Sequence, residues 1–125
     1  MILADTSIWV DHLRGSSTAM AERLESAQIM MHAAVLGELA TGNLARRDVT
    51  LAMLHALPRA RQGTLSECLE FIEAQRLYGR GIGWINAHLL ASCLVADVLL
   101  WTADDRLAKV ADELGISYRG RVRYS

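Results

Sequence analysis

Ile2-Leu3-Ala4-Asp5-Thr6-Ser7, near the start of the chain, is the stretch that decides the fold. Three apolar residues suited to a buried strand lead directly into a carboxylate and two hydroxyls. The following residues, from Ile8 to Leu13, have the pattern of a helix. In an open parallel sheet, ligands bind beside the carboxyl ends of the strands. Asp5 is therefore either a cap for the helix that follows it or part of a site at that edge.

The rest of the chain continues this alternation of short apolar runs and helical patterns. Apolar runs typical of strands follow at 29–31, 98–101 and 116–118, and the run at 98–101 is apolar enough to be buried on both faces. Helical spacing and capping residues predict helices near 18–26, 35–41, 46–57, 65–72, 84–94 and 104–114. We therefore expect one α/β domain over residues 1–125, with a mostly parallel sheet of about four to five strands flanked by helices.

Composition excludes several classes of protein. No apolar run approaches the roughly 18 residues that a membrane span needs, and the first residues lack the basic region of a signal peptide, so we expect a cytoplasmic protein without a membrane anchor. Cys68 and Cys93 both lie in helical patterns beside apolar residues, which predicts buried free thiols.

The charge pattern is lopsided although the net charge is only −1. Lys109 is the one lysine among 13 basic residues, and arginine binds phosphate bidentately where lysine does not. A general coding bias explains this preference equally well. Some arginines cluster, so a near-neutral average is compatible with a basic rim around an acidic centre: Arg59/Arg61, Arg76/Arg80 and Arg119/Arg121/Arg123.

Acidic residues follow two of the predicted strands. Asp5 follows the first, Asp104 and Asp105 follow the run that ends at Trp101, and Glu38 lies at the border of an apolar helix face. Corresponding ends of parallel strands meet at one edge, so these acids can converge, although each is separately explicable as a cap. Like charges repel unless a cation neutralises them, and oxygen ligands favour Mg²⁺ or Mn²⁺.

Histidines and tryptophans are less informative. The four histidines lack metal-ligand spacing, and packing or an RNA contact is the preferred interpretation for His88. Trp9, Trp84 and Trp101 are expected in the core or at a dimer surface. A phosphatase of the haloacid-dehalogenase type would need an acid where Ser7 stands. A receiver-like phosphoacceptor would need a lysine at a strand end, which the chain does not offer.

Four separated blocks of sequence resemble the PIN-domain nucleases, and in particular the VapC toxins of bacterial toxin–antitoxin pairs. The blocks are Ile2-Leu3-Ala4-Asp5-Thr6-Ser7-Ile8-Trp9, Val35-Leu36-Gly37-Glu38-Leu39, Arg80-Gly81-Ile82-Gly83-Trp84-Ile85 with Ala87-His88-Leu89-Leu90-Ala91-Ser92, and Thr102-Ala103-Asp104-Asp105-Arg106-Leu107. The resemblance implies a PIN-like three-layer fold and a metal-dependent endoribonuclease, the toxin of a type II system. It also implies cleavage of structured RNA (transfer or ribosomal RNA), Mg²⁺ as cofactor with Mn²⁺ able to substitute, a cognate antitoxin and a homodimer.

The resemblance also implies the site. Asp5 is the first acid, with Thr6 or Ser7 orienting it or a water. Glu38 is the second acid, and Asp104 is the last, with Asp105 as a helper.

The family's third acid falls on Asn86, which has a ligand oxygen but no charge. This departure predicts weaker metal binding, whether the Asn is natural or was introduced in place of Asp to make a toxic nuclease tolerable. The alternative function is a catalytically impaired PIN scaffold that binds RNA or a partner protein without cleaving.

Overall fold

The sheet at the centre of the molecule has four parallel strands in the order β2-β1-β3-β4. The computed structural model describes residues 1–15 and 17–119 of the chain. The strands are β1 (Ile2–Ala4), β2 (Ile29–Met30), β3 (Leu99–Trp101) and β4 (Ser117–Tyr118). The order reverses direction between β1 and β3, where consecutive crossovers leave opposite sides of the sheet, and this is where open α/β sheets place their ligands.

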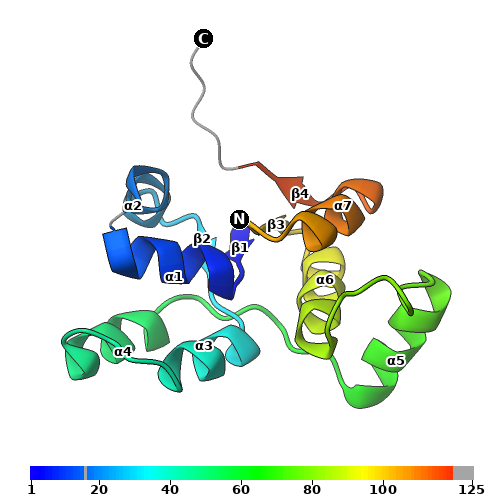
Figure 1. The fold of residues 1–125 in the computed structure, drawn as a ribbon, viewed down its shortest axis with the longest axis horizontal. Helices are drawn as coiled ribbons and strands as arrows, with labels where there is room; N and C mark the ends of the chain where they lie inside the picture. The colour runs from blue at the N-terminus through cyan, green and yellow to red at the C-terminus, as the bar shows by residue number, and fades with distance from the viewer. Residues whose placement is uncertain (16, 120–125) are drawn as a thin grey trace, which may run out of the picture.

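Helices cover the sheet on two sides, so the fold is a three-layer α/β arrangement as predicted. In Figure 1, α1 to α4 lie to one side of the strands and α5 to α7 to the other. The helices are α1 (Thr6–Gly15), α2 (Thr18–Glu25), α3 (Ala33–Ala40), α4 (Arg47–His55), α5 (Leu65–Ala74), α6 (Trp84–Ala96) and α7 (Asp105–Glu113).

The core surrounds β1 and β3, the two central strands, each of which has a partner on both sides. Leu3 is opposite Met30 of β2 and Leu100 of β3, and its side chain is completely buried. Trp9 of α1 is also fully buried. Burial of side chains this large contributes about 1.5–3 kcal/mol each, and it fixes the end of β1 in place.

Several local predictions are confirmed. The predicted capping box is present: the Thr64 hydroxyl accepts from the Glu67 amide at 3.1 Å, and the Glu67 carboxylate accepts from the Thr64 amide at 2.9 Å. Cys68 and Cys93 are buried free thiols, and burial raises the pKa of Cys93 to about 12.

Other boundaries differ from the sequence prediction. The first helix begins at Thr6 rather than Ile8, because Asp5 caps it. The strand predicted at 98–101 is shorter in the structure, where β3 begins at Leu99. Leu99 is 39% exposed, so this strand is not buried on both faces along its whole length. Met31 lies outside β2 and forms an isolated parallel bridge with Arg59.

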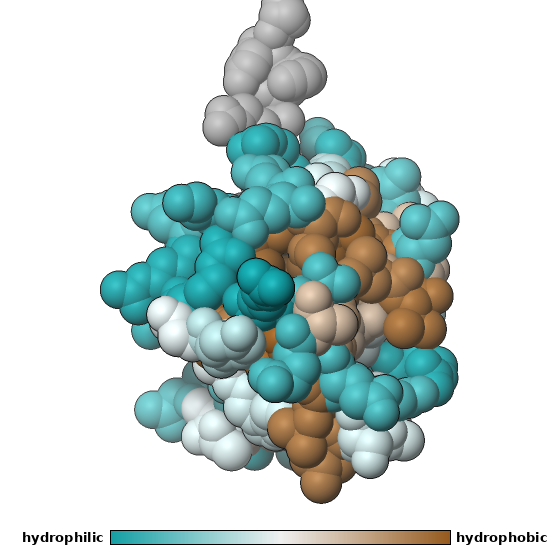
Figure 2. Space-filling view, turned by 90° about the vertical axis from the view of Figure 1, so that its right-hand side faces the viewer, coloured by the Kyte–Doolittle hydropathy of each residue, from teal (hydrophilic) through white to brown (hydrophobic). Residues whose placement is uncertain are grey.

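Exposed apolar side chains gather on one face of the molecule. On the face that carries α5 to α7, hydrophobic residues gather in patches between polar ones (Figure 2), and the exposed apolar side chains there include Leu69 and Val95. Within residues 1–15 and 17–119, no helix is long and apolar enough to cross a membrane.

Of the predicted arginine clusters, Arg121 and Arg123 lie outside the described residues, as does Ser16.

Candidate active site

Asp5 is the most constrained polar residue at the carboxyl edge of the sheet. Its side chain is 5% exposed. One carboxylate oxygen, Oδ1, accepts from the Ser7 hydroxyl at 2.5 Å and from the Ile8 amide at 3.2 Å, so Asp5 caps α1. The other oxygen, Oδ2, accepts from the Thr102 hydroxyl. Both proposed roles of Asp5, cap and site residue, are therefore compatible with one geometry.

Thr102 and Ser7 join the ends of β1 and β3 around this carboxylate. The Asp5 amide donates to the Trp101 carbonyl at 2.9 Å, which aligns the two strand ends. Thr102 Oγ1 donates to Asp5 and accepts from the Asp104 amide at 3.0 Å, while Ser7 Oγ accepts from the Ala103 amide at 3.0 Å. A buried carboxylate needs such donors to retain its charge.

Thr102 is the site residue that the sequence analysis missed, since it was named there only as part of the fourth block and was given no role in the site. The signal was available: Thr102 follows β3 directly, as Thr6 and Ser7 follow β1 within three residues. The parallel pairing of these strands places all three hydroxyls at one edge.

Glu38 lies at the same edge on α3 and is held by Thr6. The Thr6 hydroxyl donates to Glu38 Oε1 at 2.5 Å, which links α1 to α3. Glu38 is exposed, in contrast to Asp5. A cleft of about 390 Å³ opens beside Thr6 and Glu38 between α1, α3 and α4, and Arg14 and Arg46 line it. A cleft of this size is typical of ligand pockets.

Asp104 is the cap of α7, as one of the two sequence interpretations predicted. Its Oδ1 accepts from the amides of Arg106 and Leu107 at 2.9 and 3.1 Å. This leaves Oδ2 without a partner among the described residues. Asp105 occupies the first turn of α7 and is exposed.

Asn86 is in a different environment. It lies in the first turn of α6, whose cap is Gly83 without a side-chain hydrogen bond. Asn86 is partly exposed, and its amide group forms no hydrogen bond with any of the residues that the structure describes. No hydrogen bond among the described residues links it to the Asp5 network.

The donor set suits a hard divalent cation in its chemistry. Asp5, Glu38 and Asp104 offer oxygen only, and none of them is in an ion pair within the described part of the chain. Over those same residues, no three His, Cys, Asp or Glu side chains are close enough to hold one metal ion. Mg²⁺ commonly binds through one or two carboxylates and keeps several waters, so Asp5 with one further acid fits it. The metal ligands remain a prediction.

A histidine pair packs between β2 and α6, outside the acidic edge. His32 is fully buried and caps α3, its Nδ1 accepting from the Ala34 amide at 3.0 Å. Burial lowers the pKa of His32 to about 4, with smaller contributions from His88 and Arg59. His88 contacts Cys68 Sγ at 3.2 Å and stacks edge-on with Trp84. These are packing contacts, in line with the first of the two interpretations of His88.

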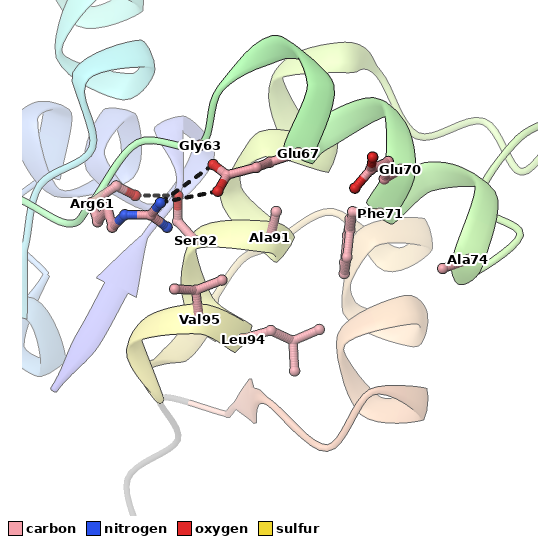
Figure 3. A pocket seen from close by; sticks show the side chains of 10 residues that line it. All are labelled: Arg61, Gly63, Glu67, Glu70, Phe71, Ala74, Ala91, Ser92, Leu94 and Val95. Carbon is pink, nitrogen blue, oxygen red and sulfur yellow. Dashed lines mark hydrogen bonds and ion pairs between the residues drawn. The ribbon is translucent and has the colours of Figure 1, made fainter.

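A second cleft lies between α5 and α6, away from the acids (Figure 3). Its lining is mostly apolar, and the Arg61–Glu67 ion pair at 3.1 Å spans its edge. The Ser92 hydroxyl donates a hydrogen bond to the Arg61 carbonyl at 2.6 Å. Nothing in this cleft matches a residue of the predicted site.

The parallel sheet and the switch point between β1 and β3, with acids at the strand ends, define an α/β protein with a site at that edge, and the family model for the PIN domain matches residues 2–113. The chain belongs to the PIN-domain family. Over 118 residues it is 40% identical to Ribonuclease VapC32 from two strains of Mycobacterium tuberculosis, covering 94% of this chain and 95% of the relative. Within the family it is thus a PIN ribonuclease of the VapC type.

A solved structure shows the same fold. The chain aligns with one from the structure of FitAB bound to an IR36 DNA fragment, with a TM-score of 0.66 and 14% identity over 99% of both chains. Identity this low shows the fold alone, and it confirms the α/β architecture predicted from the sequence.

Proposed function

We propose that this protein is a metal-dependent endoribonuclease, the toxin of a type II toxin–antitoxin pair, acting on structured RNA. Membership of the PIN-domain family and the similarity to Ribonuclease VapC32 support the ribonuclease part. The observation that carries the assignment of the site is Asp5, a buried carboxylate held by hydroxyls from two strand ends. A buried carboxylate at the carboxyl edge of a parallel sheet, beside the switch point, is in the place where open α/β sheets bind their ligands.

Each residue of the Asp5 network has a role in this proposal. Asp5 presents a fixed, negatively charged oxygen, and Thr102 and Ser7 hold its orientation so that no reorganisation is needed during the reaction. Thr6 holds Glu38 in the same way at the mouth of the neighbouring cleft. Asp104 has one oxygen engaged with the α7 amides, which leaves Oδ2 available to face the substrate edge.

Mg²⁺, with Mn²⁺ as a substitute, is the proposed cofactor. Asp5, Glu38, Asp104 and the Asn86 oxygen are its proposed ligands, with Asp5 and one further acid binding directly and the others acting through the waters that Mg²⁺ keeps. Such an ion polarises a phosphoryl oxygen and lowers the pKa of a bound water. Asp105 is the proposed helper at the start of α7.

Further parts of the proposal concern context. We propose a single domain over residues 1–125, a homodimer, a cytoplasmic location, and a cognate antitoxin that blocks the acidic edge. Transfer or ribosomal RNA is the proposed substrate class.

A second candidate function is supported by Asn86. An uncharged residue in place of an acid, without a hydrogen bond among the described residues, favours a PIN scaffold that binds RNA or a partner without cutting it. The two candidates make opposite predictions for cleavage by the unaltered chain.

The decisive experiment measures cleavage of labelled transfer and ribosomal RNA in Mg²⁺, in Mn²⁺ and in excess chelator. For Asp5→Asn we expect a loss of about 10³-fold in rate, because removal of one preorganised charged group costs this much. Asp97→Asn is the matched control, since Asp97 is exposed at the end of α6 in a left-handed conformation that Asn also adopts readily. Chelator-resistant cleavage, or equal cleavage by both variants, contradicts the proposal. Metal-independent RNA binding without any cleavage supports the scaffold.

A further inference from the structure

The side chain of Arg106 lies across the glycine loop that precedes α6. A Cβ atom added to Gly81 would approach Arg106 Nη1 to 2.5 Å, Cδ to 3.1 Å and Cζ to 3.2 Å. Gly81 also has a φ of +78°, a conformation that glycine adopts without strain. Because Gly81 has no Cβ, the Arg106 guanidinium can pack closely against the backbone of this loop.

Arg106 differs from most arginines on this half of the molecule because its charge has no partner among the described residues. Arg80 forms a bidentate pair with Glu113 at 2.7 and 2.9 Å, and Arg119 contacts Asp112 at 3.1 Å. The ion pairs of residues 1–15 and 17–119 do not include Arg106, although Asp104 and Asp105 are its immediate neighbours in sequence. The guanidinium lies against the Gly81 loop and forms no ion pair with either acid.

The backbone of Arg106 is nonetheless tied to the proposed active site. Its amide donates to Asp104 Oδ1, the Asp104 amide donates to Thr102 Oγ1, and the Thr102 hydroxyl donates to Asp5. The guanidinium is thus anchored at the acidic edge while its charge stays free. A free guanidinium beside a carboxylate cluster suits the one part of an RNA that such a cluster repels, the phosphate.

We propose that Arg106 is an RNA-binding residue that holds a backbone phosphate flanking the scissile bond, and that Gly81 is the positioning residue that lets it reach across the loop. This inference rests on the proposed nuclease function. It assigns the recognition to a phosphodiester group and not to a base, because a guanidinium fork reads the two phosphate oxygens without regard to sequence.

Binding is measured apart from cleavage, with bulk transfer RNA carrying a fluorescent 5′ label, in excess chelator and over a series of salt concentrations. For Arg106→Gln we expect about a tenfold loss of affinity, and a log–log salt dependence shallower by about 0.7–0.9, the value for one phosphate contact. Arg106→Lys keeps the positive charge, so its salt dependence should match that of the parent, but lysine cannot bind phosphate bidentately. Its affinity should therefore lie between those of Arg106→Gln and the parent. Arg23→Gln, on α2 beside the amino ends of β1 and β3, removes the same charge elsewhere and leaves both quantities unchanged.

Two glycine variants test the positioning role. Gly79 and Gly81 both have positive φ, so an alanine strains the backbone comparably at either position. Only at Gly81 does the new Cβ meet Arg106. We expect Gly81→Ala to reduce RNA affinity to the level of Arg106→Gln, with no further loss in the double variant, while Gly79→Ala binds like the parent.

The outcomes separate this inference from the proposed function. Parent-like affinity and salt slope in Arg106→Gln overturn the role of Arg106, including the case in which it serves a protein partner. Equal losses in the two glycine variants overturn the positioning role of Gly81. A parent that binds RNA but never cleaves it contradicts the nuclease and leaves the binding role of Arg106 supported by the expected losses. A parent that binds no RNA overturns both.

Discussion

The end of β1 and the start of α6 both contribute to the proposed site, but they are built in opposite ways. At the end of β1, Asp5 is buried, and each of its carboxylate oxygens accepts a hydrogen bond from a hydroxyl. At the start of α6, Asn86 follows a glycine loop, and no described residue is hydrogen-bonded to its side chain. The first position is fixed before any ligand arrives, and the second is not.

This difference teaches which part of the site the fold itself determines. Parallel pairing of β1 with β3 brings Thr102 to Asp5 whatever binds there, since the Asp5 amide is bonded to the Trp101 carbonyl. A helix start capped only by Gly83 leaves the orientation of its first turn to a ligand. Substitutions at the two positions should therefore act on different quantities.

The largest effect in this comparison is expected from Asn86→Asp. A carboxylate attracts a divalent cation where an amide does not, so we expect tighter Mn²⁺ binding and about 10²-fold faster RNA cleavage. Asp has nearly the size of Asn, and Asn86 is partly exposed and forms no hydrogen bond with a described residue, so the thermal midpoint should change little. Calorimetry with Mn²⁺ and cleavage assays on both forms make the measurement.

Gln75→Glu serves as the control for this change, because it introduces the same charge on the exposed turn after α5. If Asn86→Asp and Gln75→Glu behave alike, Asn86 lies outside the site and the two regions do not cooperate.

A smaller effect, on stability, is expected at a histidine that packs beside the first half of α6. The His32 ring, which caps α3 after β2, lies 6.5 Å from the His88 ring on α6. The pKa of His32 is lowered to about 4, so between about 6.5 and 4 the unfolded chain binds a proton that the folded chain does not. Stability should therefore fall as pH falls through this window, by about 2 kcal/mol between pH 7 and pH 5.

Denaturant unfolding at pH 7 and pH 5 measures this loss. His32→Asn keeps an acceptor for the Ala34 amide but does not titrate, so its stability should change less over the same interval. A pH dependence equal to that of the parent would assign the loss to other groups.

The smallest effect is expected at Thr102. Thr102→Val preserves shape but removes the donor to Asp5, and loss of a hydrogen bond to a charged group corresponds to about a tenfold fall in cleavage. Thr102→Ser restores the hydroxyl and should recover most of the activity. If Val and Ser behave alike, the hydroxyl does not orient Asp5.

Much of the fold could be predicted from the sequence because short apolar runs alternate with capped helices. The capping box at Thr64 and Glu67 was recognisable from residue type and spacing alone. The exposed Leu99 was not, because a continuous apolar run has no marker for the residue that emerges at the edge of the sheet.

For the site, residue type revealed the acids but not their partners. Asp5 and Glu38 were predicted from their places after a strand and on a helix face, whereas the hydroxyl of Thr102 joins Asp5 only through the pairing of distant strands. The contact of Arg106 with Gly81 likewise depends on how α7 packs against the glycine loop, which no local pattern encodes.

The pairing of β1 with β3 has a further consequence for how the protein is made. Asp5 and Thr102 are 97 positions apart, and translation proceeds from the first to the second. Until β3 leaves the ribosome, β1 lacks its central neighbour and the carboxylate lacks the donor that holds it, so domains of this topology complete their folding late in synthesis. The proposed site therefore cannot be complete in the nascent chain before β3 has emerged.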